Sequence, residues 1–188
     1  MRAKEARHCA LCGGALSEAQ VEDRARLRCG ECGFVLYLNP AAAAAGVVVN
    51  PGGEVLLVRR AIEPWRGYWA LPAGYQELDE PPEEALRREV REEAGIDVEV
   101  LGLLDLLFVD KDPRKPANVA VFLCRADATH VQPMSSDVSD AAWFGLDRLP
   151  PHIGFDNYER ILQRLSDPSR YPPSAWNHLQ ELFGGRAK

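Results

Sequence analysis

The sequence lacks a long apolar run and lacks a surplus of positive charge. Its longest apolar run, Ala41 to Val49, is too short to span a bilayer. Residues 1–8 contain no apolar segment typical of a signal peptide, so we expect a cytosolic protein without a membrane partner. The formal net charge of −6 argues against a broad electrostatic interaction with nucleic acid and leaves room only for a local basic patch.

The composition of a disordered protein is also absent. Of the 188 residues, 46% are hydrophobic and 27% are charged, which is typical of a chain that buries a core. The only low-complexity tract is Ala41–Ala45. This length accommodates one domain of ordinary size plus a small module.

Cysteine is scarce, but four of the five cysteines form two closely spaced pairs. Cys9-x-x-Cys12 and Cys29-x-x-Cys32 are separated by sixteen residues, and a glycine follows each pair. This spacing is typical of a zinc ribbon, in which four thiolates close a tetrahedral shell around a structural Zn²⁺. A disulfide or a redox motif is the alternative, which a cytosolic location and the missing strand–helix context disfavour. Cys124 lies in an apolar run and is expected in the core.

Arginines occur in the segment between the cysteine pairs, and ribbons of this kind often bind nucleic acid. Arg24, Arg26 and Arg28 are interspersed with the acidic residues Glu22, Asp23 and Glu31. We interpret this mixture as a solvated face, and the ribbon as a folding or dimer-forming module.

A charged segment after residue 80 has helical periodicity. At roughly 100° per residue, Glu89, Glu92 and Glu93 fall within an arc of about 100° on one helical face. An apolar seam at positions 86, 90 and 94 lies beside them and can pack against a sheet. Carboxylates at these spacings repel one another, whereas Mg²⁺ or Mn²⁺ would bind them. A solvated acidic face matched by nearby arginines is the alternative.

The helix is part of a longer pattern with fixed spacing. A glycine is followed after five residues by a glutamate, and after seven more by Arg-Glu-Val-Arg-Glu-Glu-Ala-Gly-Ile. This pattern resembles the Nudix box, the signature of hydrolases that act on a nucleoside diphosphate linked to another group. Its fixed positions are occupied here by Gly74, Glu80, Arg88, Glu89, Glu92, Glu93, Gly95 and Ile96.

The resemblance implies roles for the acidic residues of the box. Glu89 and Glu93 are the expected principal ligands of Mg²⁺ or Mn²⁺, and the Gly74 carbonyl is expected to complete the shell. Glu92 is a further ligand or the base that activates water. Bound cations would neutralise the diphosphate and make a water molecule acidic enough to attack phosphorus.

The ends of the helix are also indicated. Pro81 and Pro82 favour a start just after Glu80, because proline tolerates the first turn of a helix. Gly95 is a natural stop, since glycine readily adopts the left-handed conformation that ends helices. The resemblance implies that Arg88 pairs with Glu80 and holds the loop against the helix.

The fold class implied by the resemblance is α/β, a Nudix α/β/α sandwich with a mixed sheet, preceded by a small zinc ribbon. We divide the chain into a zinc ribbon at 1–38, a Nudix catalytic domain at 39–166 and a helical extension at 167–188. Apolar patterning predicts strands at Gly46–Val49, Glu54–Arg59, Leu101–Val109, Asn118–Cys124 and Ala141–Phe144, a turn at 111–116, and helices at Phe155–Leu165 and Ala175–Phe183.

A ribbon joined to a Nudix domain resembles two groups of enzymes, the ADP-ribose/FAD pyrophosphatases and the NADH pyrophosphatases. The NADH enzymes carry a Ser-Gln-Pro-Trp-Pro-Phe-Pro-x-Ser type stretch after the box, and nothing in this sequence matches it. The resemblance therefore implies hydrolysis of ADP-ribose or FAD to AMP, with NADH and nucleoside triphosphates as alternatives. We also expect a homodimer. A ligand-sensing or nucleic-acid-binding Nudix protein is the non-enzymatic alternative, which the intact box disfavours.

Substrate contacts are expected outside the box. Trp65 could stack on a base or a flavin, with packing in the core as the alternative, whereas Trp69 is expected to be buried. Arg59 is the candidate phosphate ligand, because a guanidinium matches phosphate oxygens bidentately. Its neighbour Arg60 is the alternative, since strand alternation lets only one of the two face the site.

The base that activates water has more than one candidate. In relatives, a glutamate in the loop before the last strand can take this role, and here that loop offers Asp137 and Asp140. We rank Glu92 first, Asp140 second and Glu77 third, because an aspartate is shorter than the glutamate it would replace.

Overall fold

The computed structural model describes residues 6–110, 115–165 and 167–183. Contacts divide the chain into two compact units between Pro40 and Ala41, close to the boundary expected after residue 38. We call them the N-terminal unit and the C-terminal unit. The expected helical extension at 167–188 falls within the C-terminal unit. In the described ranges, no helix is long and apolar enough to cross a membrane.

The N-terminal unit contains a small antiparallel sheet. Its three strands, in spatial order, are β1 (Leu16–Val21), β2 (Arg24–Cys29) and β3 (Val35–Leu36). Glu22 adopts a left-handed conformation with φ of 56° in the tight turn that joins β1 to β2. Because the turn is short, every residue of β1 has a partner on β2, from Leu16 opposite Cys29 to Val21 opposite Arg24.

A mixed sheet forms the centre of the C-terminal unit. Its main strands have the spatial order β10-β5-β4-β9-β8, with β6 paired to β5 and β7 paired to β4. Strands β4 and β9 pair in parallel, and the other strand pairs of this sheet in the described residues are antiparallel. The strands are β4 (Ala41–Val49), β5 (Val55–Arg60), β6 (Trp69–Ala70), β7 (Ala73–Tyr75), β8 (Glu99–Val109), β9 (Ala117–Arg125) and β10 (Val138–Phe144).

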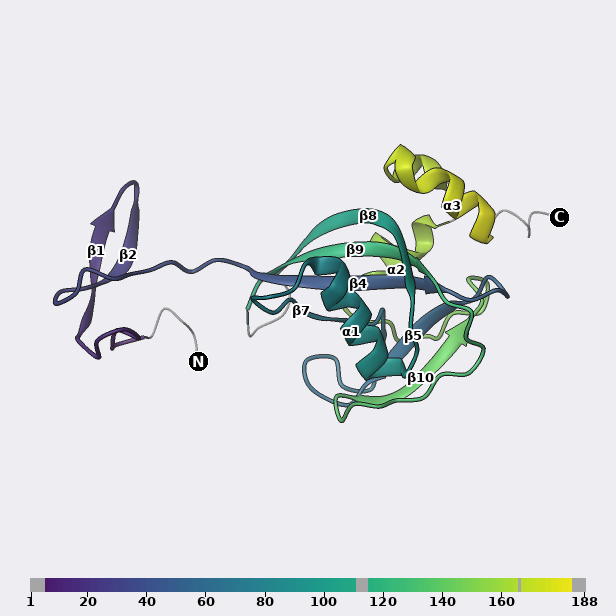
Figure 1. Cartoon of the computed structure of the whole chain (residues 1–188), viewed down its shortest axis with the longest axis horizontal. Coiled ribbons are helices and arrows are strands. Elements are labelled where there is room, and N and C mark those ends of the chain that lie inside the picture. The colour runs from purple at the N-terminus through teal and green to yellow at the C-terminus, as the bar shows by residue number, and fades with distance from the viewer. Residues whose placement is uncertain (1–5, 111–114, 166, 184–188) are drawn as a thin grey trace. The chain divides into compact units, whose positions relative to one another are not determined.

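Helices cover both faces of this sheet, which confirms the α/β/α sandwich. On one face lies α1 (Pro82–Ala94) (Figure 1). Its Leu86 and Val90 pack with Val48 of β4. On the other face, the short α2 (Asn157–Arg160) and α3 (Pro173–Phe183) lie over a core that includes Val47 and Leu179. Val47 and Val48 belong to different cores because side chains alternate between the faces of a strand.

The ends of α1 follow the predicted signals. Pro81 is the N-cap with an extended backbone, and Pro82 begins the helix. Gly95 ends it with φ of 71°, and its N–H donates to the Arg91 carbonyl at 3.0 Å. Proline lacks the N–H that a first turn leaves unpaired, and glycine has no Cβ to oppose the left-handed conformation.

Three expectations differ from the structure in extent. The expected strands are all present, but β4 starts at Ala41, because the alanine tract pairs with both β7 and β9. The helix expected at Phe155–Leu165 starts only at Asn157, since Phe155 and Asp156 are left-handed, and it is broken into α2 and the 3-10 helix Leu162–Arg164 at Ile161, whose backbone is not helical. Trp69 is half-buried rather than buried. The turn expected at 111–116 lies largely outside the described residues.

Candidate active site

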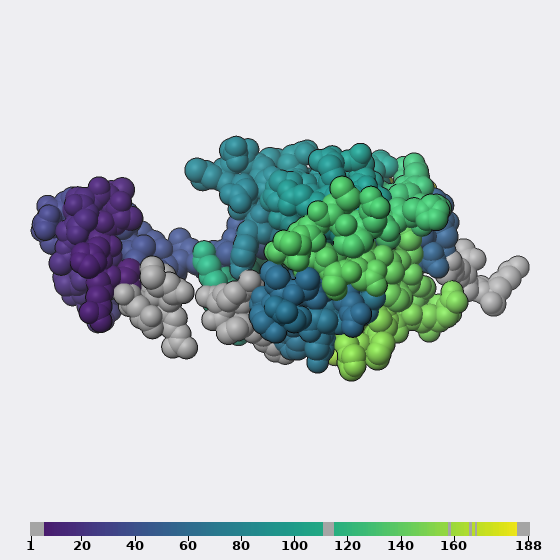
Figure 2. All heavy atoms as spheres, turned by 90° about the horizontal axis from the view of Figure 1, so that it is seen from below, coloured from purple at the N-terminus to yellow at the C-terminus, as the bar shows by residue number. Residues whose placement is uncertain are grey.

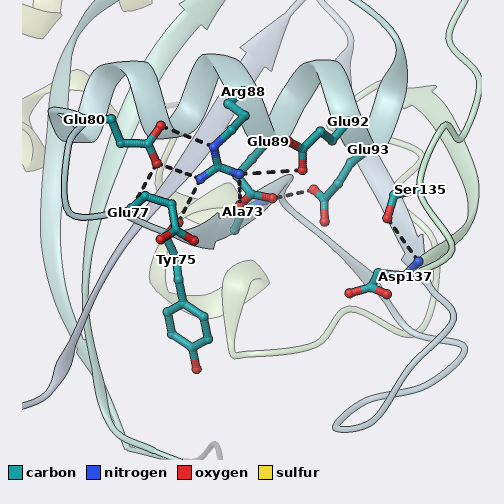
Figure 3. Close-up of polar contacts among 10 residues, drawn as sticks. All are labelled: Ala73, Tyr75, Glu77, Glu80, Arg88, Glu89, Glu92, Glu93, Ser135 and Asp137. Carbon is teal, nitrogen blue, oxygen red and sulfur yellow. Dashed lines mark hydrogen bonds and ion pairs between the residues drawn. The ribbon is translucent and has the colours of Figure 1, made fainter.

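The three box glutamates of α1 face one cavity. Glu89, Glu92 and Glu93 line it together with Gly74 of β7, and its volume is about 330 Å³. Figure 3 shows the three carboxylates on the side of α1 that faces β7. Their exposures differ, because the Glu93 residue is 8% exposed whereas the Glu92 side chain is 54% exposed. The three carboxylates therefore lie on one face of α1, as their spacing predicted, but at different depths. We call Glu89, Glu92 and Glu93 the acidic wall.

Arg88 joins the loop to the helix, as the sequence predicted. Its guanidinium donates to both carboxylate oxygens of Glu80, at 2.7 and 3.2 Å. It also donates to Glu89 at 2.7 Å and to the Tyr75 carbonyl at 2.9 Å (Figure 3). The hydrogen bond from Arg88 is the main cause of a lowered pKa for Glu80. This carboxylate is thus an ionised anchor for the loop.

Glu93 is a buried carboxyl group with little compensation. The Ala73 N–H donates to its Oε2 at 3.0 Å. Burial raises the pKa of Glu93 to about 8, and the nearby charges of Glu89 and Asp137 act in the same direction. Burial also raises the pKa of Glu89, against the opposing effect of Arg88. An ionised pair of this kind needs a cation.

The acidic wall fits a hard divalent cation. All of its side-chain donors are carboxylate oxygens, which Mg²⁺ and Mn²⁺ prefer. Gly74 leaves room for this group, because a Cβ added there would stand 1.9 Å from the Glu89 carboxyl carbon. A side chain at position 74 would therefore displace one of the expected ligands.

Other elements close the cavity around this wall. Small apolar side chains of the sheet, including Ala45 and Val121, line it on one side. Arg60 and Lys115 bring positive charge to the lining, and Phe155 brings an aromatic ring. The loop after β5 and the segment before β10 lie side by side on the surface (Figure 2), where the Ala61 N–H donates to the Asp137 carbonyl at 2.8 Å.

Arg59, the predicted phosphate ligand, is not among the residues that line the cavity, whereas its neighbour Arg60 lines it. Arg59 is exposed, and its Nε donates to the Gly67 carbonyl at 3.1 Å. Arg60 is half-buried, and its Nε donates to the Pro64 carbonyl at 2.7 Å. Alternation along β5 allows only one of the two to face the cavity, and sequence could not say which.

Trp65 does not line the cavity but supports a residue that does. Its ring lies 6.2 Å from the Phe155 ring and 5.4 Å from the Tyr68 ring, measured between centroids. The Arg60 guanidinium lies 5.0 Å from the centre of the Phe155 ring. Sequence reasoning missed Phe155, because no motif marks it and its direction depends on the left-handed backbone at residues 155 and 156.

Asp140 and Glu77 also lie outside the cavity lining, whereas Asp137, the other aspartate of the same loop, lines the cavity. Asp140 is on β10 opposite Arg59, and its carboxylate accepts a hydrogen bond from the Ala141 N–H. Glu77 is exposed, in the loop that Glu80 anchors. Asp137 precedes the strand, and Figure 3 shows it across from Glu93.

The four paired cysteines of the N-terminal unit meet at one point. The ligand atoms of Cys9, Cys12, Cys29 and Cys32 all lie within 4.8 Å of one another. The sulfur atoms of Cys9 and Cys32 are 3.6 Å apart, and those of Cys12 and Cys29 are 3.5 Å apart. These distances are too long for a disulfide of about 2.05 Å and suit four thiolates about 2.3 Å from one Zn²⁺.

Backbone amides support the sulfurs of this cluster. The N–H groups of Leu11 and Gly14 donate to the sulfurs of Cys9 and Cys12, each at 3.4 Å. Gly13 has φ of 76° and Gly33 has φ of 75°, which glycine adopts without strain. Cys124 is fully buried in the C-terminal core, as predicted. The arrangement of the cluster fits a closed structural zinc site.

An α/β/α sandwich with a carboxylate-rich box helix over a cavity defines a class of metal-dependent hydrolases. The family profile described as NUDIX domain matches residues 39–165, so this chain belongs to the Nudix family. The family match, together with a relative that is named a pyrophosphatase, supports a Nudix pyrophosphatase.

Two curated relatives and one solved structure illustrate the likeness. The ADP-ribose pyrophosphatase of Methanocaldococcus jannaschii is 35% identical over 69% of this chain and 75% of that protein. The NAD-capped RNA hydrolase NudC of Pseudomonas aeruginosa is 33% identical over 78% of this chain but only 51% of its own length. A NUDIX hydrolase from Nitrosomonas europaea has a TM-score of 0.73 and 26% identity, covering 85% of this chain and 92% of that one.

We expect one tightly held Zn²⁺ per chain. Chelation should unfold the N-terminal unit and leave the C-terminal unit folded, because the latter has its own core. Metal analysis of freshly purified protein measures the zinc, and limited proteolysis with chelator should leave a protected fragment that starts near residue 41. Cys12→Ser should reproduce the effect and Cys124→Ala should keep the zinc. Freshly purified protein without zinc would contradict the assignment.

Proposed function

We propose that this pyrophosphatase hydrolyses the diphosphate bond of ADP-linked metabolites, with ADP-ribose or FAD as substrate and AMP as a product. The observation that carries the proposal is that one cavity combines the acidic wall of α1 with Arg60 and the ring of Phe155. A diphosphate fits between a bound cation and Arg60, and a planar ring fits against an aromatic face.

The acidic wall would hold Mg²⁺ or Mn²⁺. Glu89 and Glu93 are the proposed principal ligands, with Glu92 and the Gly74 carbonyl as further ligands. When bound, the cation neutralises the diphosphate and acidifies a water molecule. Arg88 positions Glu89 through a hydrogen bond of 2.7 Å, and the same guanidinium forms its main ion pair with Glu80.

Asp137 is the proposed proton acceptor for the attacking water. It lines the cavity from the segment before β10, across from Glu93, so it can approach a water from the side opposite α1 (Figure 3). Glu92 is the alternative from the sequence, but its carboxylate lies 3.6 Å from the Arg88 guanidinium. The Glu92 carboxylate is thus already engaged in an ion pair, which favours Asp137 over Glu92 for this role.

Arg60 and Phe155 are the proposed substrate contacts in place of Arg59 and Trp65. Arg60 would bind a phosphate oxygen, and Phe155 would stack on the adenine ring. Two hydrogen bonds hold the backbone near Phe155. The Gly154 N–H donates to the Trp69 carbonyl at 2.8 Å, and the Leu71 N–H donates to Asn157 Oδ1 at 3.0 Å. A ring held in place by its neighbours loses little freedom when the substrate binds.

A second candidate substrate is an NAD-linked compound, NADH or the NAD cap of an RNA. The 33% identity to the NAD-capped RNA hydrolase NudC favours it, although this chain spans about half of that protein. The sequence lacks the stretch after the box that the NADH enzymes carry. ADP-ribose and FAD therefore remain the favoured candidate substrates.

The substrate proposal predicts a clear order in a hydrolysis screen. With Mg²⁺ or Mn²⁺, we expect AMP chiefly from ADP-ribose or FAD, and slower hydrolysis of NADH, NAD-capped RNA and deoxynucleoside triphosphates. Mass spectrometry identifies the products. Faster hydrolysis of NADH or capped RNA would replace the first candidate by the second. An inactive protein with zinc and fold intact would exclude both.

Removal of the buried ligand tests the metal assignment. Glu93→Gln should lower kcat on the best substrate at least about a hundredfold, because a ligand charge is lost. The fold should persist, since an amide oxygen can still accept the hydrogen bond from Ala73. Glu84→Gln, on the exposed side of the same helix, is the matched control and should retain full activity. An unchanged rate for Glu93→Gln at saturating metal would refute this role.

A neighbouring pair of aspartates tests the proposed base. Asp137→Asn should lower kcat at least about tenfold with little change in KM, because proton acceptance contributes about 10² to 10⁴-fold. Asp140→Asn removes the same charge three positions along the chain, outside the cavity, and should leave kcat near the wild-type value. The assignment to Asp137 fails if both variants behave alike, or if Glu92→Gln alone abolishes turnover.

A further inference from the structure

The register of the small sheet sorts the charges of the N-terminal unit by face. Arg24, Arg26 and Arg28 alternate along β2, so all three side chains stand on the same face. Their direct partners on β1 are Val21, Ala19 and Ser17, and Val35 of β3 is the second partner of Arg28. These partners are small or apolar and carry no charge. We call this surface the arginine face.

The acidic residues of the same segment lie elsewhere. Glu18 is opposite Leu27, whose side chain stands on the other face of the sheet. Glu22 and Asp23 form the turn between β1 and β2. Glu31 lies in the second cysteine pair, where its carboxylate is next to Gly14. The mixture of signs seen along the sequence is therefore separated in space.

The three arginines have no carboxylate partner among the described residues. Each ion pair that the structure records in the described ranges lies in the C-terminal unit. Arg24 and Arg28 are exposed. The Arg26 guanidinium lies 4.5 Å from the centre of the Tyr37 ring, and this tyrosine is 50% exposed. A row of unpaired positive charge thus borders an accessible aromatic ring.

We propose that the arginine face binds a single-stranded nucleic acid. At about 3.3 Å per residue, alternate positions on a strand are about 6.6 Å apart, so the three guanidinium groups can contact successive phosphates. Tyr37 would stack on an unpaired base, which combines a basic track with an aromatic platform. The net charge of −6 belongs to the whole chain and does not describe this face.

Binding can be measured on the full chain with bound zinc, by fluorescence anisotropy of labelled single-stranded RNA and DNA 20-mers. Three phosphate contacts predict that affinity for a single strand falls with salt with a logarithmic slope of about −2. The triple variant Arg24→Gln, Arg26→Gln, Arg28→Gln should bind at least about tenfold more weakly at low salt. Zinc content and thermal unfolding verify that its N-terminal unit is intact.

The matched control removes the same charge from the C-terminal unit. Arg91, Arg148 and Arg170 are exposed and already face a carboxylate, so their combined change to Gln should leave binding within about twofold. Tyr37→Leu should weaken binding about fivefold or more, whereas Tyr37→Phe keeps a ring and should bind like wild type. The proposal is overturned if wild type binds neither strand at low salt, or if both triple variants lose affinity equally.

Discussion

The guanidinium of Arg88 makes contacts with three separate parts of the active site at once. It pairs with Glu80 in the loop, donates to the Tyr75 carbonyl at the end of β7 and holds the Glu89 carboxylate. Since Glu89 and Glu93 are both withdrawn from water, their positions depend on such contacts: Arg88 holds the Glu89 carboxylate, and the Ala73 N–H of β7 holds that of Glu93. The proposed chemistry depends on that placement.

How far the sequence predicts the site depends on whether its residues are close in the chain. The box and the cysteine pairs are local patterns with fixed spacing, and the structure brings their members together as expected. Among the candidates from other segments, Arg59, Asp140 and Trp65 do not line the cavity, whereas Arg60, Asp137 and Phe155 do. Arg59 and Asp140 are directly opposite each other on β5 and β10. The pairing of β10 with β5 also contains a register shift between Val138 and Asp140, which no local pattern in the sequence encodes.

The fold shows the same division between local and distant information. Five strands of the C-terminal unit, β4, β5, β8, β9 and β10, and the helix α1 follow from apolar patterning, and the caps of α1 follow from proline and glycine. The short strands β6 and β7, the break at Ile161 and the packing of α3 depend on contacts with the rest of the unit. In the N-terminal unit, alternating signs in the sequence suggested a mixed surface, yet a period of two residues in a strand separates those signs by face.

The left-handed pair Phe155 and Asp156 has a consequence for how this enzyme can change over evolution. Its backbone is held by neighbouring loops, so the direction in which residue 155 projects is largely independent of the side chain it carries. A new residue at this position would alter the shape of one end of the cavity and leave the acidic wall untouched. With the proposed role of Phe155 in substrate binding, substrate preference and hydrolytic chemistry would therefore be able to change separately in descendants of this gene. Glycine and asparagine, which accept this conformation most readily, would open the cavity at the least conformational cost.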